Sequence, residues 1–514
     1  MLRSVRTSMV AIGVVVVLLT MQAGVDAKKK ISKRKHRTTT GAPLVITLPT
    51  FTPVAPEGIP VNRISVMRDD SFVNSAGPAA RTASANPSGG GGMSIDSAGD
   101  SASGDKKGKG RITIDPLRPL NPLAGTLLIS EFRLRGPSGA SDEFIEIYNN
   151  SGADHQVASI SGTGYGVAAS DGVVRCTIPN ATVIPDGGHY LCVNNTAVSG
   201  YSLSTYPSGN GTTATGDATY TTDIPDNAGI ALFNNNSGGA SFSLANRFDA
   251  VGSDSEALTL YREGAGYATL TPFSINYAWV RDECGKGGSI TTNGPCSIST
   301  PKDTDDNAAD FYFVDTNGTQ AGGGQRLGAP GPQNLSSPIQ RNSGMPAFLL
   351  DATVANSSAP NRVRDFTSVP ATNSTFGTLS IRRRFINATG TDVTRLRFRI
   401  IDLTTFPAPS GTADLRPITS GSVVVAGIND TTTCGDAGLV APCTVTVQGT
   451  DLEGGEVGEV PNQPNGGGFN SSMSVGTITL QTPLLSGDSI NVQFLLGLQQ
   501  TGNFRIFVNI EALP

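Results

Sequence analysis

Alternation of apolar and polar residues near the carboxyl terminus constrains the fold more than any other feature. Apolar side chains occupy every second position in two consecutive runs: Ile490, Val492, Phe494, Leu496 and Leu498, then Phe504, Ile506, Val508 and Ile510. A period of two is the period of a β-strand, whose successive side chains point to opposite faces of the sheet. Residues 500–503, between the runs, include Gly and Asn, which favour a turn. The pattern therefore predicts two strands that each bury one face.

The same alternation occurs earlier in this part of the chain, where arginines fill the polar positions. The apolar residues and their arginine neighbours are Leu379, Ile381, Leu396, Phe398 and Ile400, with Arg382, Arg384, Arg395, Arg397 and Arg399. We interpret residues 345–514 as a β-sandwich with an apolar face buried and an arginine-rich face exposed to solvent. Binding of an anionic polymer by this arginine face is the alternative interpretation.

The composition of the whole chain agrees with an all-β fold. Glycine (62 residues) and proline (32 residues) are frequent, and charged residues make up only 15% of the chain. No long apolar stripe with helical periodicity follows the first thirty residues. β-Branched residues favour pleated strands, whereas Gly, Pro and Asn favour turns. We therefore predict an all-β protein.

The amino terminus has the three parts of a secretory signal peptide. Arg3 and Arg6 precede an apolar run at 9–21, and small residues at 25–27 offer a cleavage point. The apolar run has about 13 residues, fewer than the roughly 20 that cross a bilayer. Residues 1–27 are therefore predicted to be a signal peptide, although the lysines at 28–30 oppose translocation. We expect no transmembrane span in the mature chain.

Residues 28–120 are predicted to be a disordered linker, basic at first and then rich in Pro, Ser and Gly. The segment 28–37 contains seven Lys and Arg residues and no acidic residue, and we interpret it as a solvated tail. The rest of the linker has too few clustered apolar residues to form a core. Residues 38–514 contain 28 basic and 41 acidic residues. Because an acidic body repels phosphate backbones, a nucleic acid partner is not expected.

The cysteines point to an oxidising compartment. Six of them fall into three local pairs: Cys176 with Cys192, Cys284 with Cys296, and Cys434 with Cys443. Each pair is expected to form a disulfide that closes a loop of about 8 to 15 residues. A zinc site is the alternative, but the chain has no CxxC motif and only three histidines. The cysteines therefore favour a secreted protein that is stabilised by disulfides.

A series of short strand patterns occupies residues 121–335. The patterns lie at 127–132, 142–150, 173–178, 189–193, 229–233 and 257–261, with turn residues between them. In the second pattern Phe144 and Tyr148 share one face, while Ile145 and Ile147 occupy the other. Short strands at regular spacing without helices are typical of a β-sandwich.

Several motifs in this region resemble the lamin-tail domain family as it occurs in secreted bacterial proteins. They are the opening pair at 128–131 and 143–149, the middle strands at 184–191 and 227–233, the strand at 248–252, and the closing segments at 303–311 and 327–334. The resemblance covers residues 121–335. This region departs from the compact form of the family by long Ser/Thr/Asn/Gly insertions, such as 195–225, and by two cysteine pairs.

The resemblance implies an immunoglobulin-like β-sandwich that serves adhesion or anchoring. In secreted bacterial proteins such domains often accompany nucleases, phosphatases or other hydrolases. Residues 345–514 resemble carboxy-terminal segments of uncharacterised secreted bacterial proteins, which indicates architecture and no activity. We therefore expect two immunoglobulin-like β-sandwich domains behind the signal peptide and the disordered linker.

No combination of residues in the sequence predicts catalysis. His155 and His189 are the histidines for a Ser/His/Asp triad, but His189 lies in a strand motif, and G-x-S-x-G, H-E-x-x-H and P-loop motifs are absent. Glu131, Glu143 and Glu146 are candidates for the paired carboxylates of a glycosidase. Strand positions of a sandwich are the simpler interpretation of these glutamates. We predict no catalytic residues and no enzyme activity.

The densest cluster of candidate metal ligands lies in one loop and consists of Asp303, Asp305, Asp306 and Asp310. Carboxylate oxygens at this density suit Ca²⁺, the one cofactor that the sequence suggests. The loop lacks the Gly at its sixth position and the closing Glu of an EF-hand. A solvated turn is therefore the simpler interpretation.

Together these features predict a secreted or cell-surface structural or adhesive protein. We expect it to bind an extracellular protein or polymer, whose identity the sequence does not indicate, through its β-sandwich domains. The alternative is an accessory module of an extracellular hydrolase, or the hydrolase itself, with nuclease, phosphatase or glycosidase activity.

Overall fold

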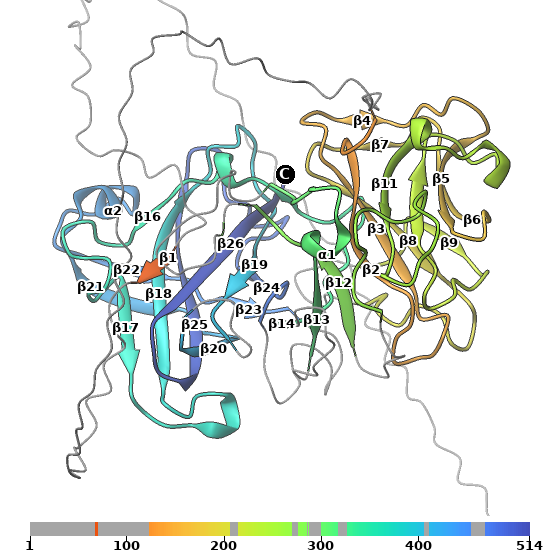
Figure 1. Cartoon of the computed structure of the whole chain (residues 1–514). Coiled ribbons are helices and arrows are strands. Elements are labelled where there is room, and N and C mark those ends of the chain that lie inside the picture. The colour runs from red at the N-terminus through yellow and green to blue at the C-terminus, as the bar shows by residue number, and fades with distance from the viewer. Residues whose placement is uncertain are drawn as a thin grey trace, which may run out of the picture. The chain divides into compact units, whose positions relative to one another are not determined.

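The computed structural model describes residues 67–69, 123–205, 214–269, 276–284, 286, 300–316, 326–405, 411–453 and 468–514. All of these belong to one compact unit, Pro60–Pro514. The predicted signal peptide, the basic segment and nearly all of the predicted linker lie outside the described residues. The regular structure that is described consists of strands with two short α-helices and four 3₁₀ turns, which confirms the predicted all-β class (Figure 1). Among these residues there is no helix with the length and hydropathy of a membrane span.

The first sandwich packs a seven-stranded sheet on a four-stranded sheet. The larger sheet has the order β14 (Arg326–Leu327), β13 (Phe311–Asp315), β12 (Tyr277–Arg281), β2 (Leu127–Arg133), β3 (Phe144–Asn149), β8 (His189–Asn194) and β9 (Ala218–Tyr220). The smaller sheet has the order β11 (Arg247–Val251), β10 (Ile230–Phe233), β5 (Gly164–Ala169) and β6 (Val174–Pro179). Most strands that the sequence predicts here are therefore confirmed.

The strand predicted at 257–261 is wrong, because this segment forms turns. The backbone N–H of Tyr261 donates to the carbonyl of Leu258 at 2.8 Å, which closes a turn. The Arg247 guanidinium donates hydrogen bonds to the carbonyls of Thr259 and Leu260 at 3.0 Å each. Hydrogen bonds from a buried side chain, rather than from a neighbouring strand, therefore satisfy these backbone carbonyls.

The two sheets of the first sandwich share an apolar core and a disulfide. Phe132, Trp279 and Phe313 from the larger sheet pack in one cluster with Val167 and Leu232 from the smaller sheet. The bond between Cys176 in β6 and Cys192 in β8 joins one sheet to the other.

The second sandwich packs two further sheets on each other (Figure 1). One has the order β1 (Met67–Asp69), β26 (Phe504–Leu513), β19 (Arg395–Leu403), β24 (Ser472–Ser474) and β23 (Asp451–Leu452), and β15 (Ile339–Gln340) also pairs with β26. The other has the order β16 (Ala347–Leu349), β18 (Thr378–Ile386), β25 (Ser489–Gln500) and β20 (Asp414–Ile418), and β17 (Arg362–Asp365) also pairs with β18. β1 is the one described strand from the predicted linker.

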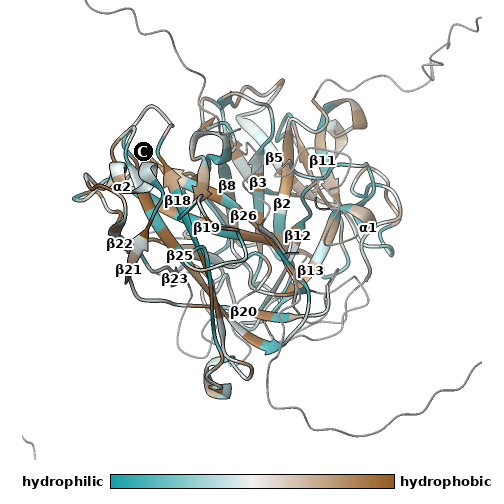
Figure 2. Cartoon of the chain, turned by 90° about the vertical axis from the view of Figure 1, so that its left-hand side faces the viewer, coloured by the Kyte–Doolittle hydropathy of each residue, from teal (hydrophilic) through white to brown (hydrophobic). Residues whose placement is uncertain are grey.

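The two alternating carboxy-terminal runs form β25 and β26, which lie in different sheets. β25 pairs with β18 and β20, whereas β26 pairs with β19, β15 and β1. The turn between them therefore crosses from one sheet to the other. The chain crosses here because Phe494 and Leu496 of β25 face the same core as Ile506 and Val508 of β26. Figure 2 shows hydrophobic and hydrophilic residues alternating along these strands.

Two small ribbons and two short helices complete the described fold. They are β21 (Val423–Ile428) with β22 (Cys443–Val447), β4 (His155–Gln156) with β7 (Val183–Ile184), α1 (Asn307–Asp310) and α2 (Thr431–Asp436). A disulfide between Cys434 in α2 and Cys443 in β22 closes the first ribbon.

Candidate functional site

Polar side chains join the outer face of the seven-stranded sheet to the β19–β26 sheet of the second sandwich. The Asn470 amide donates to Glu131 at 3.0 Å, and the Asn509 amide donates to Glu283 at 2.6 Å. The Lys286 ammonium donates to the carbonyl of Ile401 at 2.8 Å, and this residue is 7% exposed. Each of these contacts links residues that are more than a hundred positions apart. We call this set of buried contacts the charged layer.

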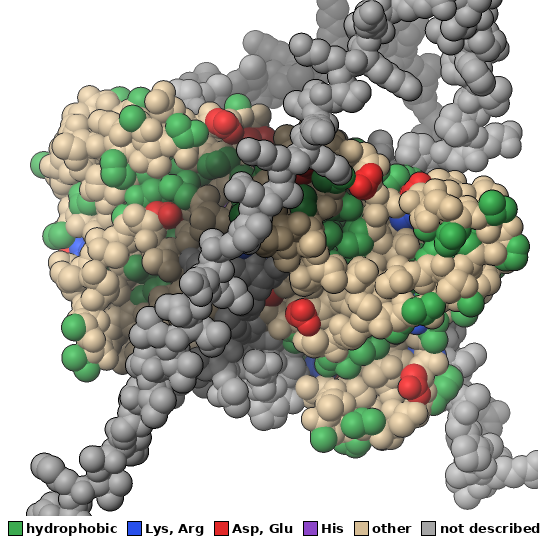
Figure 3. Space-filling view, turned by 180° about the vertical axis from the view of Figure 1, so that it is seen from behind, with side chains coloured by type: hydrophobic (Ala, Val, Ile, Leu, Met, Phe, Trp, Pro, Cys, Tyr) green, Lys and Arg blue, Asp and Glu red, His purple; other side chains and the backbone are tan. Residues whose placement is uncertain are grey.

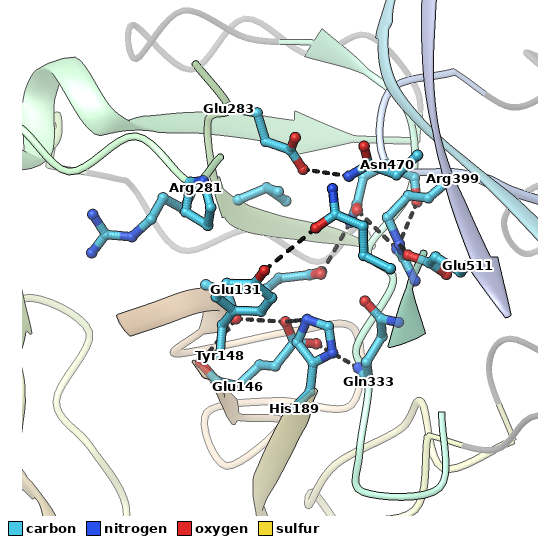
Figure 4. Close-up of a pocket in the computed structure, with 15 residues that line it drawn as sticks. Glu131, Glu146, Tyr148, His189, Arg281, Glu283, Gln333, Arg399, Asn470 and Glu511 are labelled. Atoms are coloured by element: carbon cyan, nitrogen blue, oxygen red, sulfur yellow. Dashed lines mark hydrogen bonds and ion pairs between the residues drawn. The ribbon is translucent and has the colours of Figure 1, made fainter. Parts of the chain in front are cut away.

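A cavity of about 70 Å³ lies within the charged layer (Figure 4). Glu131, Glu146, Tyr148 and His189 line it from the first sandwich, and Figure 4 places them across from Arg399, Asn470 and Glu511. Its other lining residues are Ser130, Val280, Arg281, Glu283, Pro301, Gln333, Gln340 and Asn509. The cavity has room for about two water molecules, at roughly 30 Å³ each.

Glu131 and Glu146 face each other across β2 and β3, opposite the bulge between Ile129 and Glu131. This bulge shifts the alternation of β2, so that Ile129 and Phe132 both enter the core while Glu131 turns outward. Glu131 accepts from the backbone N–H of Gly331 at 2.8 Å as well as from Asn470. The structure therefore brings together two of the three glutamates that the sequence indicated.

Burial raises the pKa of both carboxyl groups. Desolvation raises the pKa of Glu131 to about 7, although Gly331 and Arg399 oppose this shift. Desolvation and the neighbouring charge of Glu131 raise the pKa of Glu146 to about 8. The Ser130 hydroxyl lies 2.6 Å from Glu146 Oε1, and the backbone N–H of Gln333 donates to Oε2. All four carboxylate oxygens thus have partners within the protein, and the raised pKa values favour retention of a proton on Glu146 at neutral pH.

Glu143 and His155 do not line the cavity, whereas His189 does. Glu143 is fully buried beside Asn194, whose amide donates to it at 2.9 Å. His189 lies 3.6 Å from Glu146, and burial lowers its pKa to about 3, so its ring is neutral. His155 contacts the hydroxyl of Tyr165 at 3.1 Å.

The arginine-rich face of β19 is buried, and the prediction that it is exposed is wrong for Arg397 and Arg399. These two side chains are 0% and 7% exposed. Arg397 pairs with Glu511 and, at 3.4 Å, with Glu453, while Arg399 pairs with Glu511 at 2.8 Å. Burial acts to raise the pKa of Glu511, but the two arginines hold it below its usual value. The physical reason for the burial is the neighbouring sandwich, because Asn470 contacts both Arg399 and Glu131.

Other arginines of the predicted face have different surroundings. Arg384 is buried and pairs with Asp436 of α2, so its predicted exposure is also wrong. Arg382 and Arg395 are half-buried. The face as a whole therefore does not present a continuous charged surface.

The four aspartates of the predicted calcium loop do not converge on one point, although Asp303 and Asp310 both lie near Arg281. Asp310 is fully buried and accepts from the N–H and hydroxyl of Thr304, at 2.8 and 2.7 Å. Asp306 caps α1 by accepting from the backbone N–H of Ala308. Asp303 lies 3.5 Å from Arg281, and Asp305 is exposed with a left-handed φ of 58°. A calcium ion held by this set stays a prediction.

Two of the predicted disulfides are confirmed, Cys176–Cys192 and Cys434–Cys443. Cys284 is disulfide-bonded, and its predicted partner Cys296 lies outside the described residues.

Comparison with known proteins gave no relative: no family model, no curated protein and no solved structure matches this chain.

Sequence reasoning missed Gln333, Asn470 and Asn509, which supply donors to the charged layer. Asn509 occupies a polar position of β26, between the apolar Val508 and Ile510. Glu511 shares that outward face, and opposite charges on Glu511 and the β19 arginines are the signal in the sequence that the two strands pair. Nothing in the local sequence around Asn470 indicates its partner.

The raised pKa values of Glu131 and Glu146 predict that the folded chain loses stability as the pH rises from about 4.5 to about 8. Below the unfolded value of 4.5 both states bind the protons, whereas between 4.5 and the folded values of about 7 and about 8 only the folded state keeps them. The free energy of unfolding therefore falls over this interval. Urea denaturation at pH 5.5 and pH 8.5 will give a lower midpoint at the higher pH.

The variant Glu146→Gln tests whether this acid pair is the cause. A glutamine amide has an oxygen to accept from Gln333 and an NH₂ to donate to the Ser130 hydroxyl, so it matches the protonated acid. We expect the urea midpoint of the variant to fall less between pH 5.5 and pH 8.5 than that of the unaltered protein. An equally large fall contradicts the assignment of the pH dependence to this acid pair.

Proposed function

We propose that this chain is a structural or adhesive protein of the cell exterior, without enzyme activity, that presents two joined β-sandwiches as one binding body. The observation that carries the proposal is the charged layer. The polar sheet faces that would be available to a substrate or polymer are used to hold the sandwiches together. Contact with a partner is then left to the loops and outer surfaces.

One loop is well suited to such contact. Phe366, Val369 and Phe376 are 62%, 41% and 47% exposed, and all three lie in the connection between β17 and β18. The Arg364 guanidinium stacks 4.7 Å from the centre of the Phe366 ring and donates to the carbonyl of Phe376 at 2.9 Å. Exposed aromatic side chains held in a fixed loop favour contact with a partner surface. We call residues 366–376 the aromatic loop.

The covalent chemistry and the surface support an extracellular setting. Disulfides persist in oxidising compartments and are rare in the cytosol. Figure 3 shows a face on which uncharged side chains and backbone predominate, with scattered hydrophobic patches and few charged groups. This surface favours contacts through hydrogen bonds and apolar side chains over electrostatic attraction. The resemblance to the lamin-tail domain points to the same role in adhesion or anchoring.

Retention of the purified protein on cell envelopes of the producing organism tests the proposal. We expect the double variant Phe366→Ser and Phe376→Ser to lose at least about tenfold in apparent affinity, because aromatic anchors dominate such contacts. Leu480→Ser is the matched control, since Leu480 is 75% exposed in another turn of the second sandwich. Equal retention of both variants contradicts a role for the aromatic loop.

An activity screen tests the non-enzymatic part of the proposal. We expect no turnover of nuclease, phosphatase or glycosidase substrates. Metal-dependent turnover that is lost in Asp305→Asn or Asp310→Asn would contradict the proposal.

A further inference from the structure

Three carboxylates of the first sandwich converge at one point. Among the described residues, Asp249, Glu263 and Asp303 each place one oxygen so that the three oxygens lie within 4.8 Å of one another. Asp249 belongs to β11, Glu263 follows the turns at 257–261, and Asp303 precedes α1. The group thus gathers three separate segments. Of its members, the sequence had indicated only Asp303 as a candidate ligand.

Glu263 has a buried oxygen with no hydrogen-bond partner among the described residues. Its side chain is 7% exposed, and Oε1 pairs with Arg247 at 2.6 Å, which leaves Oε2 without a partner. A buried carboxylate oxygen in this condition costs free energy unless a proton or a cation satisfies it. The unpartnered oxygen is the observation that separates this group from an ordinary acidic cluster.

Arginines contact the group but leave negative charge in excess. Arg281 approaches Oδ2 of Asp249 at 2.5 Å and Oδ1 of Asp303 at 3.5 Å, and it also lies 3.8 Å from Asp310. Arg247 pairs with Glu263. Four carboxylates therefore share two guanidinium groups. The remaining oxygen of Asp249, Oδ1, accepts from the backbone N–H of Ala250 at 2.8 Å.

Asn307 holds the three segments in place before any ligand binds. It is fully buried, and its side-chain oxygen accepts from the backbone N–H of Gly252 at 3.0 Å and of Glu263 at 2.9 Å. Its amide donates to the carbonyl of Ala250 at 2.9 Å. The positions of the carboxylates are therefore fixed by the fold. The Asp303 side chain, 29% exposed, leaves a route to solvent.

We propose that Asp249, Glu263 and Asp303 bind a divalent cation, Ca²⁺, which joins the three segments at this end of the first sandwich. Ca²⁺ suits the group because it takes six to eight oxygen ligands in variable geometry, so that water completes the shell on the exposed side. Burial and mutual repulsion raise the pKa of Glu263 to about 9 and of Asp303 to about 6, and a bound cation offsets both effects. This site differs from the loop that the sequence indicated, because Asp305, Asp306 and Asp310 are not ligands.

Calorimetric titration of CaCl₂ into the chelator-treated, full-length chain tests the proposal. We expect one site with a dissociation constant of about 10⁻⁴ to 10⁻³ M, the range of extracellular calcium modules. Glu263→Gln and Asp303→Asn will each weaken binding at least about tenfold, since each removes a charged ligand. Asp305→Asn is the matched control in the same loop and will bind as the unaltered protein does.

Near-ultraviolet circular dichroism will show whether each variant is folded. If Glu263→Gln is unfolded, the Asp303→Asn variant tests the proposal. The Asp303 side chain is partly exposed, so this substitution leaves the buried core intact. Absence of binding by the unaltered protein at about 10 mM CaCl₂ overturns the proposal, because this exceeds the range of known modules. Binding that is lost in Asp305→Asn and kept in Asp303→Asn overturns it as well, in favour of a different set of ligands.

Discussion

Replacing Arg397 with alanine will lower the free energy of unfolding by about 3 to 5 kcal/mol, the cost of removing one partner from a buried ion pair. Arg397 is fully buried, and it pairs with both Glu511 and Glu453, whose side chains are 4% and 1% exposed. The alanine variant leaves these buried carboxylates in a low-dielectric layer with less positive charge to compensate them. The loss is therefore much larger than for an ion pair at the surface.

Urea denaturation measures this effect, and the same strand offers a matched control. Arg395 also lies in β19 but is half-buried. We expect Arg395→Ala to change the free energy of unfolding by less than about 1 kcal/mol, as is usual for partly exposed charges. If Arg397→Ala costs no more than Arg395→Ala, the buried ion pairs of Arg397 do not stabilise the fold in the way we describe.

Removal of the Cys176–Cys192 disulfide by a double alanine substitution will cost about 3 kcal/mol. The two cysteines are 16 positions apart, and their bond joins the two sheets of the first sandwich. Without it the unfolded chain gains conformational freedom, so the folded state becomes less stable relative to it. Guanidinium denaturation of the oxidised protein and of the double variant measures the difference.

The Cys434–Cys443 disulfide provides the comparison for this prediction. Its cysteines are nine positions apart, and they close a ribbon outside the two sandwiches. We expect its removal to affect the ribbon more than the sandwiches, and to shift the main unfolding transition less. A larger shift from this second pair means that the bond between the sheets does not limit unfolding of the first sandwich.

The strands were predictable wherever one face enters a core and the other does not. Phe494 and Ile506 illustrate this, because alternation with a period of two indicates a strand without any knowledge of its neighbours. Alternation does not say which strands pair, and it did not indicate that β25 and β26 belong to different sheets. The segment 257–261 was mistaken for a strand because its turns are fixed by Arg247, a residue ten or more positions away.

The candidate site was predictable only in part, for the same reason. Glu131 and Glu146 stood out in the sequence, but the donor to Glu131 is Asn470, at a separation of 339 positions. The arginines of β19 were correctly placed on the face opposite the core. A local sequence pattern cannot show that a second sandwich covers this face, so the burial of these arginines could not be predicted from the sequence. The acid group at Asp249 and Glu263 likewise comes from segments that only the fold brings together.

The buried contacts also indicate how the two sandwiches depend on each other. Lys286 lies 4.9 Å from the ring of Phe469 and also contacts Ile401. Phe469 packs in an apolar cluster with Phe144 and Val280 of the first sandwich. Separation of the sandwiches exposes this cluster and leaves the polar partners of the charged layer unpaired. We therefore expect the two sandwiches to unfold together.

Differential scanning calorimetry of the intact chain tests this central claim most directly. If the charged layer makes one cooperative body of residues 123–514, a single transition will appear, and its calorimetric and van't Hoff enthalpies will agree. In Asn470→Ala, which removes the donor to Glu131 of the first sandwich, this transition will broaden or split as the coupling weakens. Two separate transitions in the unaltered protein, one for each sandwich, would contradict the account.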